Sequence, residues 1–497
     1  MFAQRASSIV DGSPIVYPFS EAAEAHPTGL IACLQQIKGG SSSILTAPSS
    51  KAYNTDRLGF NLRFNYKPAA IFHPRSEDEG AAAIRCAAIH NVAVVPRSGG
   101  HSYEGYGIGG KDGALIIDLN LFQKIAMDTN TGIAIVAAGV RLGDLYTKVW
   151  DAGQYLIPAG TCPTVGIGGL ALGGGLGMVG RKYGLLSDSI VSMTMIDANG
   201  NVQEVNATSN IDLFWALRGA GAGSYGLVTE FKIQAYKAPD KVTTFSIIYP
   251  LRTYRSAIEA FGAWGPSAAD DVMAVMILKP SSIRINVNFL GPKEQAQETI
   301  NTLLNRIPGK PTRIKMVEGT WLQAAIKWGS GTLNSTAWEG SRYTQGRSLL
   351  YRTPLSTNEM DIIYKYLNYS PDNDTITRVL IDVWGGKIDR PSSSSSAFDN
   401  HRGVLYSIQF FIAWNDPSST SGSIGPKCLK WSTDFAKEIR AAYRSGHNLE
   451  AYQNYIERDL PNWLHAYYGN NVLRLQQIKK TFDPQNVFTF PQAIPLP

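Results

Sequence analysis

The sequence has no apolar stretch close to the roughly 20 residues that a helix needs to cross a bilayer, so we expect no membrane-spanning segment. It also lacks a run of basic residues, because the net charge is only +6 over 497 residues and the basic side chains are scattered. That pattern is typical of a solvated surface and argues against a nucleic-acid partner. No internal repeat of solenoid period is present. We therefore expect a globular protein without nucleic-acid or membrane partners.

Cysteine is scarce: there are four residues, and none forms a CxxC or a Cys/His zinc spacing. We therefore expect no structural metal. Cys33 and Cys86 lie in apolar, helix-like segments, where they could be two buried thiols or one disulfide. We favour the disulfide, which would tie the N-terminal helix to the first domain and contribute up to about 4 kcal/mol in the chain-entropy model. The sequence indicates no role for Cys428.

A signal peptide is also missing, since the first residues contain no apolar core. Four Asn-X-Ser/Thr sequons nevertheless favour a secreted glycoprotein, numbered after a removed leader, over an intracellular protein. They begin at Asn206, Asn334, Asn368 and Asn373. The length and a hydrophobic content of 44% predict two or three domain-sized units with a large core.

From about residue 68 to 234, short β-branched runs alternate with helical segments and glycine turns, which predicts an α+β unit. The expected strands are 92–96, 114–119 and 132–139, a hairpin over 193–205 with an Asn199-Gly200 turn, and a strand pair over 224–236. Helices are expected at 77–90 and 142–153, the second ending at a glycine.

After about residue 238 the pattern changes to an antiparallel sheet covered by helices. Strands are expected at 243–251, 272–278, 283–290, 378–386 and 404–414, and helices at 255–264 and 294–307. The serine-rich stretch 391–396 predicts a polar loop. A last helix, starting at 472, is expected to stop at Asp483-Pro484.

Three glycine-rich loops concentrate the chemistry: 97–103, 160–177 and 217–226. Glycine lets backbone N–H groups approach a pyrophosphate, although a single such loop can equally be a plain turn. None of the three fits the Rossmann fingerprint, which disfavours a nicotinamide enzyme. His101 lies in the first loop and Cys162 in the second. Together they suggest two nucleophiles placed against one cofactor.

The motifs RSGGHSYEGYGIGG, GTCPTVGIGG with GGGLG, DLFWALRGAGAGSYG and the C-terminal stretch 451–488 give the chain a family resemblance. It resembles the FAD-linked oxidases of the berberine-bridge-enzyme type, within the vanillyl-alcohol-oxidase superfamily, and above all the fungal oligosaccharide oxidases. The resemblance implies an FAD-binding domain of the PCMH type, made of two α/β subdomains, and a substrate domain. The implied division is an N-terminal segment 1–67, an FAD domain 68–237, a substrate domain 238–450, and a C-terminal segment 451–497 that returns to the FAD domain.

The resemblance also implies FAD attached twice, through its 8α carbon to His101 and through its C6 to Cys162. Two bonds would fix the flavin ring without protein covering it, which permits an open groove, and would raise its potential. The Cys33–Cys86 pair matches the disulfide of the family. The remaining implied cofactor contacts are Arg97, Ser98, Gly99, Gly100, Ser102, Tyr103, Gly160, Val165, Gly166, Gly168, Gly169, Gly226 and Val228.

For catalysis, Tyr455 matches the base of the family and Asp382 its carboxylate partner. A tyrosine with a pKa near 10 is a poor base alone, and a nearby carboxylate does not lower that pKa. We therefore expect a relay in which Asp382 accepts the phenol proton as Tyr455 takes that of the substrate. Taken without the resemblance, the two residues are a surface tyrosine and a strand-end aspartate.

Substrate contacts are implied for Tyr103 and Gln409, the latter on the same strand face as Ser407 and Phe411 or, alternatively, an outward polar residue. Leu380 stands where the glucooligosaccharide enzymes have a hydrogen-bonding glutamine. The resemblance therefore does not identify which sugar is the substrate, or that the substrate is a sugar. Val165 matches the oxygen gate of the family, where valine goes with oxidases, so we expect O2 as acceptor and H2O2 as product.

Three functions follow as hypotheses. The first is a monomeric oligosaccharide oxidase that makes a lactone at the reducing-end carbon. The second is a secondary-metabolite oxidase of the same family, or a sugar dehydrogenase that reacts poorly with O2. The third is a flavin carrier without turnover, against which Tyr455 and Asp382 argue. A groove lined by aromatic and polar side chains favours the sugar, and a closed apolar pocket favours the metabolite.

Overall fold

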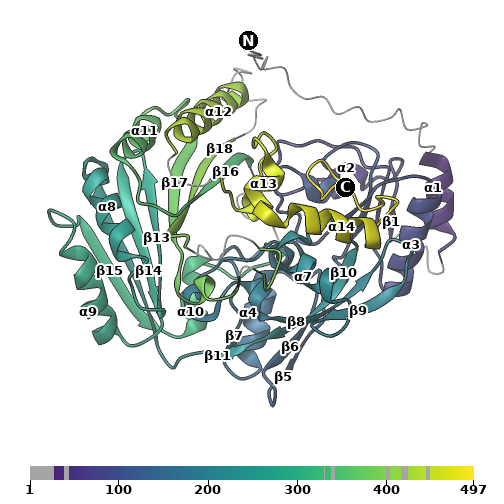
Figure 1. Cartoon of the computed structure of the whole chain (residues 1–497), viewed down its shortest axis with the longest axis horizontal. Helices are drawn as coiled ribbons and strands as arrows, with labels where there is room; N and C mark the ends of the chain where they lie inside the picture. Colours follow the sequence, from purple (N-terminus) through teal and green to yellow (C-terminus); the bar gives the residue numbers. More distant parts are fainter. Residues whose placement is uncertain are drawn as a thin grey trace, which may run out of the picture.

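The computed structural model describes residues 27–37, 44–329, 331–336, 342–392, 394–398, 403–415, 424–443 and 448–497. Residues 1–26 and 38–43 of the expected N-terminal segment 1–67 lie outside these ranges. Ser393 of the serine-rich loop also lies outside them. The chain forms two halves that face each other (Figure 1). The fold class is α+β, as predicted.

The first half contains a four-stranded and a five-stranded sheet. In the four-stranded sheet, of order β1-β2-β4-β3, the last three strands run parallel. Its strands are β1 (Leu45–Thr46), β2 (Ala70–Phe72), β3 (Val94–Arg97) and β4 (Leu115–Asp118). The antiparallel second sheet, of order β5-β6-β10-β8-β9, comprises β5 (Ile125–Asp128), β6 (Ile133–Ala137), β8 (Ile190–Ile196), β9 (Val202–Asn206) and β10 (Leu227–Gln234). These elements provide the strands predicted before residue 206.

The hairpin predicted over 193–205 is confirmed, because β8 and β9 pair antiparallel across a turn with Gly200 at φ +78°. The strand pair predicted over 224–236 is wrong. That segment is the single strand β10, followed by the two-residue β11 (Tyr236–Lys237), which pairs with β7 (Tyr155–Leu156) instead. The continuous alternation of buried and half-buried residues along β10 explains why no turn divides it.

Helices cover the sheets of the first half, and the two predicted helices are confirmed as α3 (Glu77–Ile89) and α4 (Leu142–Asp151). The disulfide is also confirmed: Cys33 on α1 (Pro27–Gln35) bonds to Cys86 on α3, with the Cα atoms 5.8 Å apart. The other helices here are α2 (Tyr53–Asp56), α5 (Ile167–Leu172), α6 (Gly180–Tyr183) and α7 (Ile211–Ala220).

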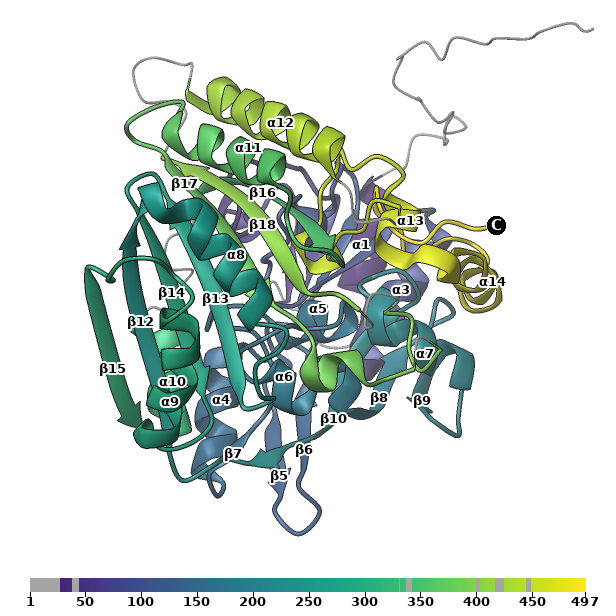
Figure 2. The same cartoon turned by 60° about the vertical axis from the view of Figure 1, so that its left-hand side comes forward.

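The second half is a seven-stranded antiparallel sheet of order β15-β12-β14-β13-β17-β18-β16. Its strands are β12 (Val242–Pro250), β13 (Val272–Lys279), β14 (Ser282–Phe289), β15 (Arg313–Gly319), β16 (Tyr343–Tyr351), β17 (Ile376–Val383) and β18 (Tyr406–Trp414). One face turns toward the first half, and the outer face is covered by α8 (Tyr254–Trp264), α9 (Lys293–Leu304), α11 (Thr357–Asn368) and α12 (Ile424–Ala442) (Figures 1 and 2). The predicted antiparallel sheet with a helical cover is therefore confirmed.

Of the helices in this half, α8 and α9 match the predicted segments, whereas α10 (Trp321–Trp328), α11 and α12 were not predicted. Helix α10 packs back on the first half, where the Trp321 ring meets Tyr146 of α4 edge to face, 6.0 Å between centroids. The chain thus crosses between the two cores within the segment expected to form the substrate domain.

Successive side chains of the central strands point alternately into the hydrophobic core and into a cavity. On β17, Val379 and Ile381 are buried in the core beneath the helices, while Arg378, Leu380 and Asp382 line a cavity between the two halves. Because successive side chains point to opposite faces, one strand supplies both the core and the site.

The C-terminal segment returns to the first half, as Figure 1 shows in yellow, through α13 (Trp463–Tyr468) and α14 (Val472–Phe482). Leu475 and Ile478 of α14 join the core of the first half. The helix ends where Asp483-Pro484 predicted, and Asp483 forms a fully buried ion pair with Lys479, 2.7 Å between Nζ and Oδ2. Among the helices of the described ranges, none is long and apolar enough to cross a membrane.

Candidate active site

A cavity of about 1020 Å³ lies between the two halves, at the upper end of the range for small-molecule sites. Both halves line it, and it brings together the residues predicted for the cofactor, the substrate and the chemistry. All of these line the cavity: Arg97, Ser98, Gly99, Gly100, His101, Ser102, Tyr103, Gly160, Cys162, Val165, Gly166, Gly168, Gly169, Gly226, Val228, Leu380, Asp382, Gln409 and Tyr455.

The first two glycine loops touch each other along the floor of the cavity. A Cβ on Gly99 would overlap the backbone nitrogen of Gly166, so a side chain at either position would push the loops apart. The Ser98 hydroxyl donates to the Ala138 carbonyl (2.6 Å), and the Ser102 hydroxyl accepts the Tyr106 N–H (3.1 Å). The Ser98 donor is therefore used within the protein, the Ser102 hydroxyl keeps its proton for a ligand, and the glycines present backbone.

Gly169 shows that these loops form a cradle. It is exposed, it lines the cavity, and no atom lies within 4 Å of the position a Cβ would take. A side chain there would fill space that a phosphate-bearing ligand can occupy. The floor therefore fits a nucleotide cofactor whose charge is bound by N–H groups.

The two predicted attachment residues converge on one hydroxyl. His101 Nε2 lies 2.8 Å from Oγ1 of Thr164, and Cys162 Sγ lies 3.4 Å from the same atom. Phe60 stacks on the imidazole, with ring centroids 4.2 Å apart. Burial, and then the Arg141 charge, lower the pKa of His101 to about 3. The imidazole is therefore neutral at physiological pH and keeps a nitrogen lone pair, as a nucleophile requires.

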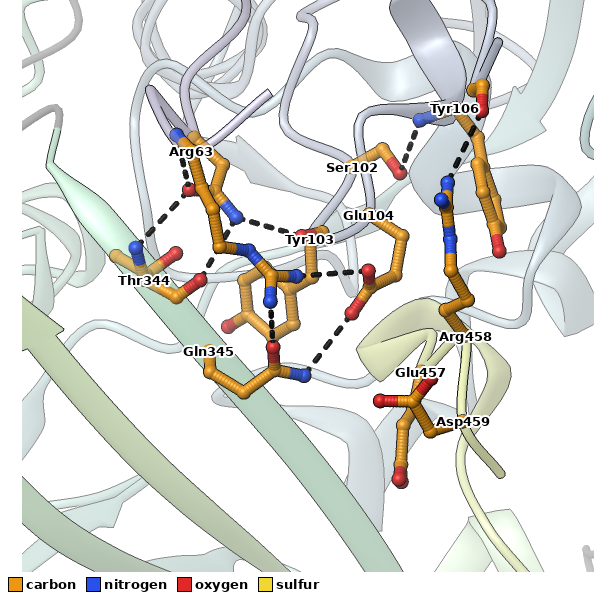
Figure 3. Close-up of polar contacts among 12 residues, drawn as sticks. Arg63, Ser102, Tyr103, Glu104, Tyr106, Thr344, Gln345, Glu457, Arg458 and Asp459 are labelled. Atoms are coloured by element: carbon orange, nitrogen blue, oxygen red, sulfur yellow. Dashed lines mark hydrogen bonds and ion pairs between the residues drawn. The ribbon is translucent and has the colours of Figure 1, made fainter. Parts of the chain in front are cut away.

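A buried polar network joins the His101 loop to the sheet of the second half (Figure 3). Arg63 Nη2 binds Glu104 Oε2 at 2.8 Å, and Gln345 Nε2 donates to Glu104 Oε1 at 3.1 Å. Arg63 also donates to the Gln345 side chain. Asn61 donates to the Tyr103 carbonyl (2.7 Å) and to the Thr344 carbonyl (3.0 Å). The network holds residues 103–104, which follow His101 closely, against β16.

Tyr103 is clamped on several sides. Its hydroxyl accepts a hydrogen bond from Gln409 Nε2 (2.8 Å), and its ring stacks on Tyr455 with centroids 5.8 Å apart. A Cβ on Gly346 would lie 2.6 Å from the Tyr103 ring, so the ring lies directly against the bare backbone of β16. Gln409 therefore points into the site together with Phe411, and the outward alternative is wrong.

Asp382 is the one acid among the described residues that line this cavity. Burial, with a smaller opposing effect from the neighbouring Ser407 hydroxyl, raises the pKa of Asp382 to about 7. Its Oδ2 is inaccessible to solvent and has no hydrogen-bond partner in the described part of the chain. A carboxyl that titrates near neutrality can accept a proton during a reaction and release it afterwards.

Tyr455 lies on a 3-10 turn, Gln453–Tyr455, that the C-terminal segment brings over the cavity. Burial first, and then the charge of Asp382, raise the pKa of Tyr455 well above its ordinary value. The phenol is therefore neutral in the free protein. The surface-tyrosine alternative is wrong, because the ring packs against Tyr103 and meets Tyr452 edge to face at 5.0 Å.

The end of the second glycine loop packs against the C-terminal segment. The Tyr452 hydroxyl accepts the N–H groups of Gly175 (3.1 Å) and Leu176 (3.0 Å), which fastens the C-terminal segment to the second loop. The third loop reaches the cavity through Ala222, Gly223 and Gly226.

Arg97 lines the cavity, but its charge is engaged elsewhere. Its guanidinium binds Asp118 and Asp56, the latter at 3.0 Å, and His73 Nε2 lies 2.9 Å from the other Asp56 oxygen. The acidic and imidazole groups of Asp56, His73 and Asp118 lie within 4.8 Å of one another, and the guanidinium supplies the positive charge that balances them. Arg97 therefore anchors the end of β3 beneath the His101 loop.

Several site residues are missed by reasoning from the sequence. Thr164 stands two residues after Cys162, yet nothing marks a lone threonine as the partner of both attachment residues. Gln345 and Gly346 lie on β16, whose sequence YTQGRSLLY is buried along nearly its whole length and shows no alternation. Arg378 is four residues before Asp382 on the same face, and the period of two could have identified it.

Two families of known proteins match parts of this chain. A family model described as FAD binding domain matches residues 68–206, and one described as Berberine and berberine like matches residues 451–495. The first match covers most strands of the two sheets, without β1 and β10, together with the His101 and Cys162 loops, and the second covers the segment that carries Tyr455. Fold and matches together define an FAD-dependent oxidoreductase with an FAD-binding domain of the PCMH type.

Similar proteins extend over nearly the whole chain. It is 29% identical to the chitooligosaccharide oxidase of Gibberella zeae, over 93% of each chain. The structure of BBE-like 1 from Physcomitrella patens is 35% identical, with a TM-score of 0.85, and the match covers 94% of this chain and 99% of that one. The glucooligosaccharide oxidase of Acremonium strictum, described with a 6-S-cysteinyl, 8α-N1-histidyl FAD, is 27% identical with a TM-score of 0.86, over 94% and 99%. The chain belongs to the berberine-bridge-enzyme-like FAD-linked oxidoreductases.

Proposed function

We propose that this enzyme is an oligosaccharide oxidase, which oxidises the anomeric C1 hydroxyl at the reducing end to a lactone and uses O2 as its acceptor. The observation that carries the proposal is the part of the cavity wall that both halves form around Tyr103. There, aromatic rings (Tyr103, Tyr455) stand beside a polar amide (Gln409) and a carboxyl poised near neutrality. Such a wall suits a polar ring with an apolar face better than a purely apolar metabolite.

His101 and Cys162 would hold the cofactor covalently. Because Nε2 of His101 is paired with Thr164, Nδ1 is the nitrogen left for a bond, and it has no hydrogen-bond partner among the described residues. Cys162 presents its thiol from the adjoining loop. FAD, when bound, supplies the acceptor for a hydride. The two-point attachment named for the Acremonium strictum enzyme supports the same arrangement here.

Side chains of the protein would accept the proton of the C1 hydroxyl group. Oxidation of the C1–OH group removes a hydride from carbon and a proton from oxygen, and leaves the lactone carbonyl. Tyr455 would take the hydroxyl proton while its own phenol proton passes to Asp382. The order follows from the pKa directions: the Tyr455 phenol is too weak an acid to be ionised beforehand, whereas Asp382 is half-ionised near pH 7.

O2 would be reduced to H2O2 by the two electrons taken from the sugar. Val165, a half-buried residue of the second loop, lines the cavity three positions after Cys162. Its short side chain would leave space for a diatomic gas. One mole of peroxide per mole of lactone is the expected yield, and a dye-dependent enzyme that forms no peroxide would be a dehydrogenase instead.

The test is anaerobic reduction of the yellow holoenzyme by single sugars. Cello-, xylo-, chito- and maltooligosaccharides and lactose are mixed with the enzyme, and the flavin absorbance is followed. At least one of them should bleach the flavin, and mass spectrometry should show a lactone two hydrogens lighter than the sugar. The matched control is Asp382→Asn, which should bind flavin and be bleached much more slowly by the same sugar. Failure of all carbohydrates to bleach the wild-type flavin would sink the proposal.

We further propose a secreted, monomeric glycoprotein. Asn334, Asn368 and Asn373 are exposed and Asn206 is half-buried at the end of β9, so the sequon side chains lie at the surface. A mass decrease on endoglycosidase treatment of protein from a eukaryotic host would test glycosylation, and light scattering would test the monomer.

A further inference from the structure

The cavity wall formed by the seven-stranded sheet is rich in positive charge. The described second half contributes five basic side chains to the lining, and Asp382 is the single acid there. The basic residues are Lys279, Arg284, Lys327, Arg342 and Arg378. This imbalance is not needed to contact a neutral sugar, whose hydroxyls are bound as well by amides and hydroxyl groups.

Three of these residues lie together on adjacent strands. Lys279 is the last residue of β13, and Arg378 lies on the neighbouring strand β17. Arg284 lies on β14, the neighbour on the other side, where it is paired with Ile277 of β13. Because Leu278 of β13 pairs with Val379 of β17, the register brings Lys279 level with Arg378. All three side chains project from the cavity face.

The three cations have no carboxylate partner within the described ranges, although ion pairs are frequent elsewhere in the protein. The Arg378 guanidinium lies over the Phe411 ring at 4.3 Å, and its Nε is shielded from water without a hydrogen-bond acceptor. Burial, and then the charges of Arg284 and Arg378, lower the pKa of Lys279. Like charges crowded in a partly desolvated site leave the free enzyme with repulsion that an anion would relieve.

The position of this cluster relative to the chemistry is also defined. On β17, Arg378 and Asp382 are four residues apart on one face, which corresponds to about 13 Å at the usual rise of a strand. Leu380 lies between them and offers no hydrogen bond to a neutral hydroxyl. A substrate that reaches both ends must be an oligosaccharide, with its oxidised end at Asp382 and a distal ring at Arg378.

We propose that Lys279, Arg284 and Arg378 form a subsite for an anionic sugar ring, and that the preferred substrate is an acidic oligosaccharide carrying uronic-acid carboxylates. The inference rests on the proposed oxidation of a reducing-end hydroxyl. The planar guanidinium of Arg378 matches a carboxylate through two parallel N–H···O bonds, and Lys279 adds a point charge beside it. The carboxylate replaces the counter-charge that the cavity wall itself lacks.

A pair of substrates that differ only in charge tests the proposal. Trigalacturonic acid and its methyl ester have the same rings, and only the free acid is anionic. We expect kcat/KM of the wild-type holoenzyme to be roughly ten- to hundredfold higher for the free acid than for the ester, because the free acid has the lower KM. The KM for the acid should rise with NaCl concentration, and that for the ester should not. A sulfated trisaccharide in a third arm separates a carboxylate-specific subsite from one that accepts any anion.

Variants locate the effect on the sheet. Lys279→Met and Arg284→Met should each lower the acid-to-ester ratio, and the combined variant should lower it further and weaken the response to salt, while Arg378 remains to bind the carboxylate. The matched control is Lys437→Met, at an exposed lysine of α12, which should keep the wild-type ratio. Quenching of the tryptophan fluorescence that is lost in a Trp328→Phe variant reports binding of acid and ester without turnover, because the Trp328 ring lines the cavity.

The outcomes separate the two proposals. If neutral oligosaccharides bleach the flavin and the acid binds and reacts no better than its ester, the anionic subsite is wrong and the proposed oxidase activity stands. If no sugar, acidic or neutral, reduces the flavin, the oxidase proposal fails and this inference fails with it.

Discussion

The two walls of the cavity are built in opposite ways. The wall of the first half is made from short loops whose glycines bring backbone to the surface, with His101 and Cys162 among them. The wall of the second half is made from side chains that project from strands β13, β14, β17 and β18. The first wall can bind a group common to many enzymes, because backbone N–H groups are the same everywhere, and the second can change with substrate by single substitutions.

Because the two walls differ in this way, substitutions in each wall should impair a different property of the enzyme. Removal of a side chain from the loop wall should affect whether the cofactor stays, and removal from the sheet wall should affect what the bound cofactor can oxidise. Variants of each wall can therefore be sorted by two measurements, flavin content and rate of flavin reduction.

The largest effect is expected from His101→Ala with Cys162→Ala, which should give mostly colourless protein. Cys162→Ala alone should keep flavin through His101 and lose most activity. Acid denaturation followed by mass spectrometry measures the attachment. Cys428→Ala is the matched control, because that thiol is buried in the core under α12 and burial raises its pKa to about 12, so it is inert. A bright yellow double variant that retains activity would contradict covalent attachment at these residues.

Asp382→Asn comes next and should leave the flavin bound while slowing its reduction by about 10²–10⁴-fold, since an amide cannot accept the proton. In the wild-type enzyme the reduction rate should rise with pH through about 7, because burial raises the pKa of Asp382 to that value and only the ionised form is a base. Stopped-flow reduction across that range measures both effects. Asp240→Asn, at an exposed carboxylate, should leave the pH profile unchanged.

Gly346→Ala tests the link between the walls. The added methyl group would come within 2.6 Å of the Tyr103 ring, which Gln409 and Tyr455 hold from other sides. We expect flavin content to be unchanged and kcat/KM to fall by roughly 10- to 100-fold, because the ring must move by a fraction of an ångström or more. Ala268→Gly, at a half-buried position outside the cavity, is the control. Wild-type kinetics in Gly346→Ala would mean that Tyr103 does not position the substrate.

The smallest effect concerns the support of the loop wall. Burial raises the pKa of Asp56, but the His73 hydrogen bond and the Arg97 charge outweigh it and lower that pKa to about 2. This carboxylate therefore contributes about 2 kcal/mol above pH 4, which is lost as the pH falls toward 2. The His73 pKa is raised, so its contribution is complete below about pH 6.5 and is lost as the pH rises through the folded value.

Asp56→Asn should therefore lower Tm by about 2–4 °C between pH 4 and 6.5 and by less at more acidic pH. Differential scanning calorimetry of the holoenzyme measures the shift, and Asp374→Asn, at an exposed site, is the control. An equal shift at every pH would mean that the loss comes from packing instead of charge.

The sequence alone determined the loop wall. Glycines, a histidine and a cysteine that touch one cofactor stand within short motifs, because a loop brings neighbouring residues to the same place. Alternation along 378–386 and 404–414 likewise predicts that Asp382 and Gln409 lie on strands. Strand β16 could not be predicted, since polar and apolar residues do not alternate along its sequence, YTQGRSLLY.

Only the tertiary structure decided the sheet wall. The neighbours of Asp382 come from β13 and β18, and Tyr455 arrives from the C-terminal segment, so the proton relay depends on strand order and on the return of the chain. The crowding of Arg378 with Lys279 and Arg284 is likewise invisible in the sequence, where Arg378 stands far from the other two. Their mutual repulsion exists only because antiparallel pairing brings distant residues onto one face, and that repulsion makes an anionic substrate the proposal that follows.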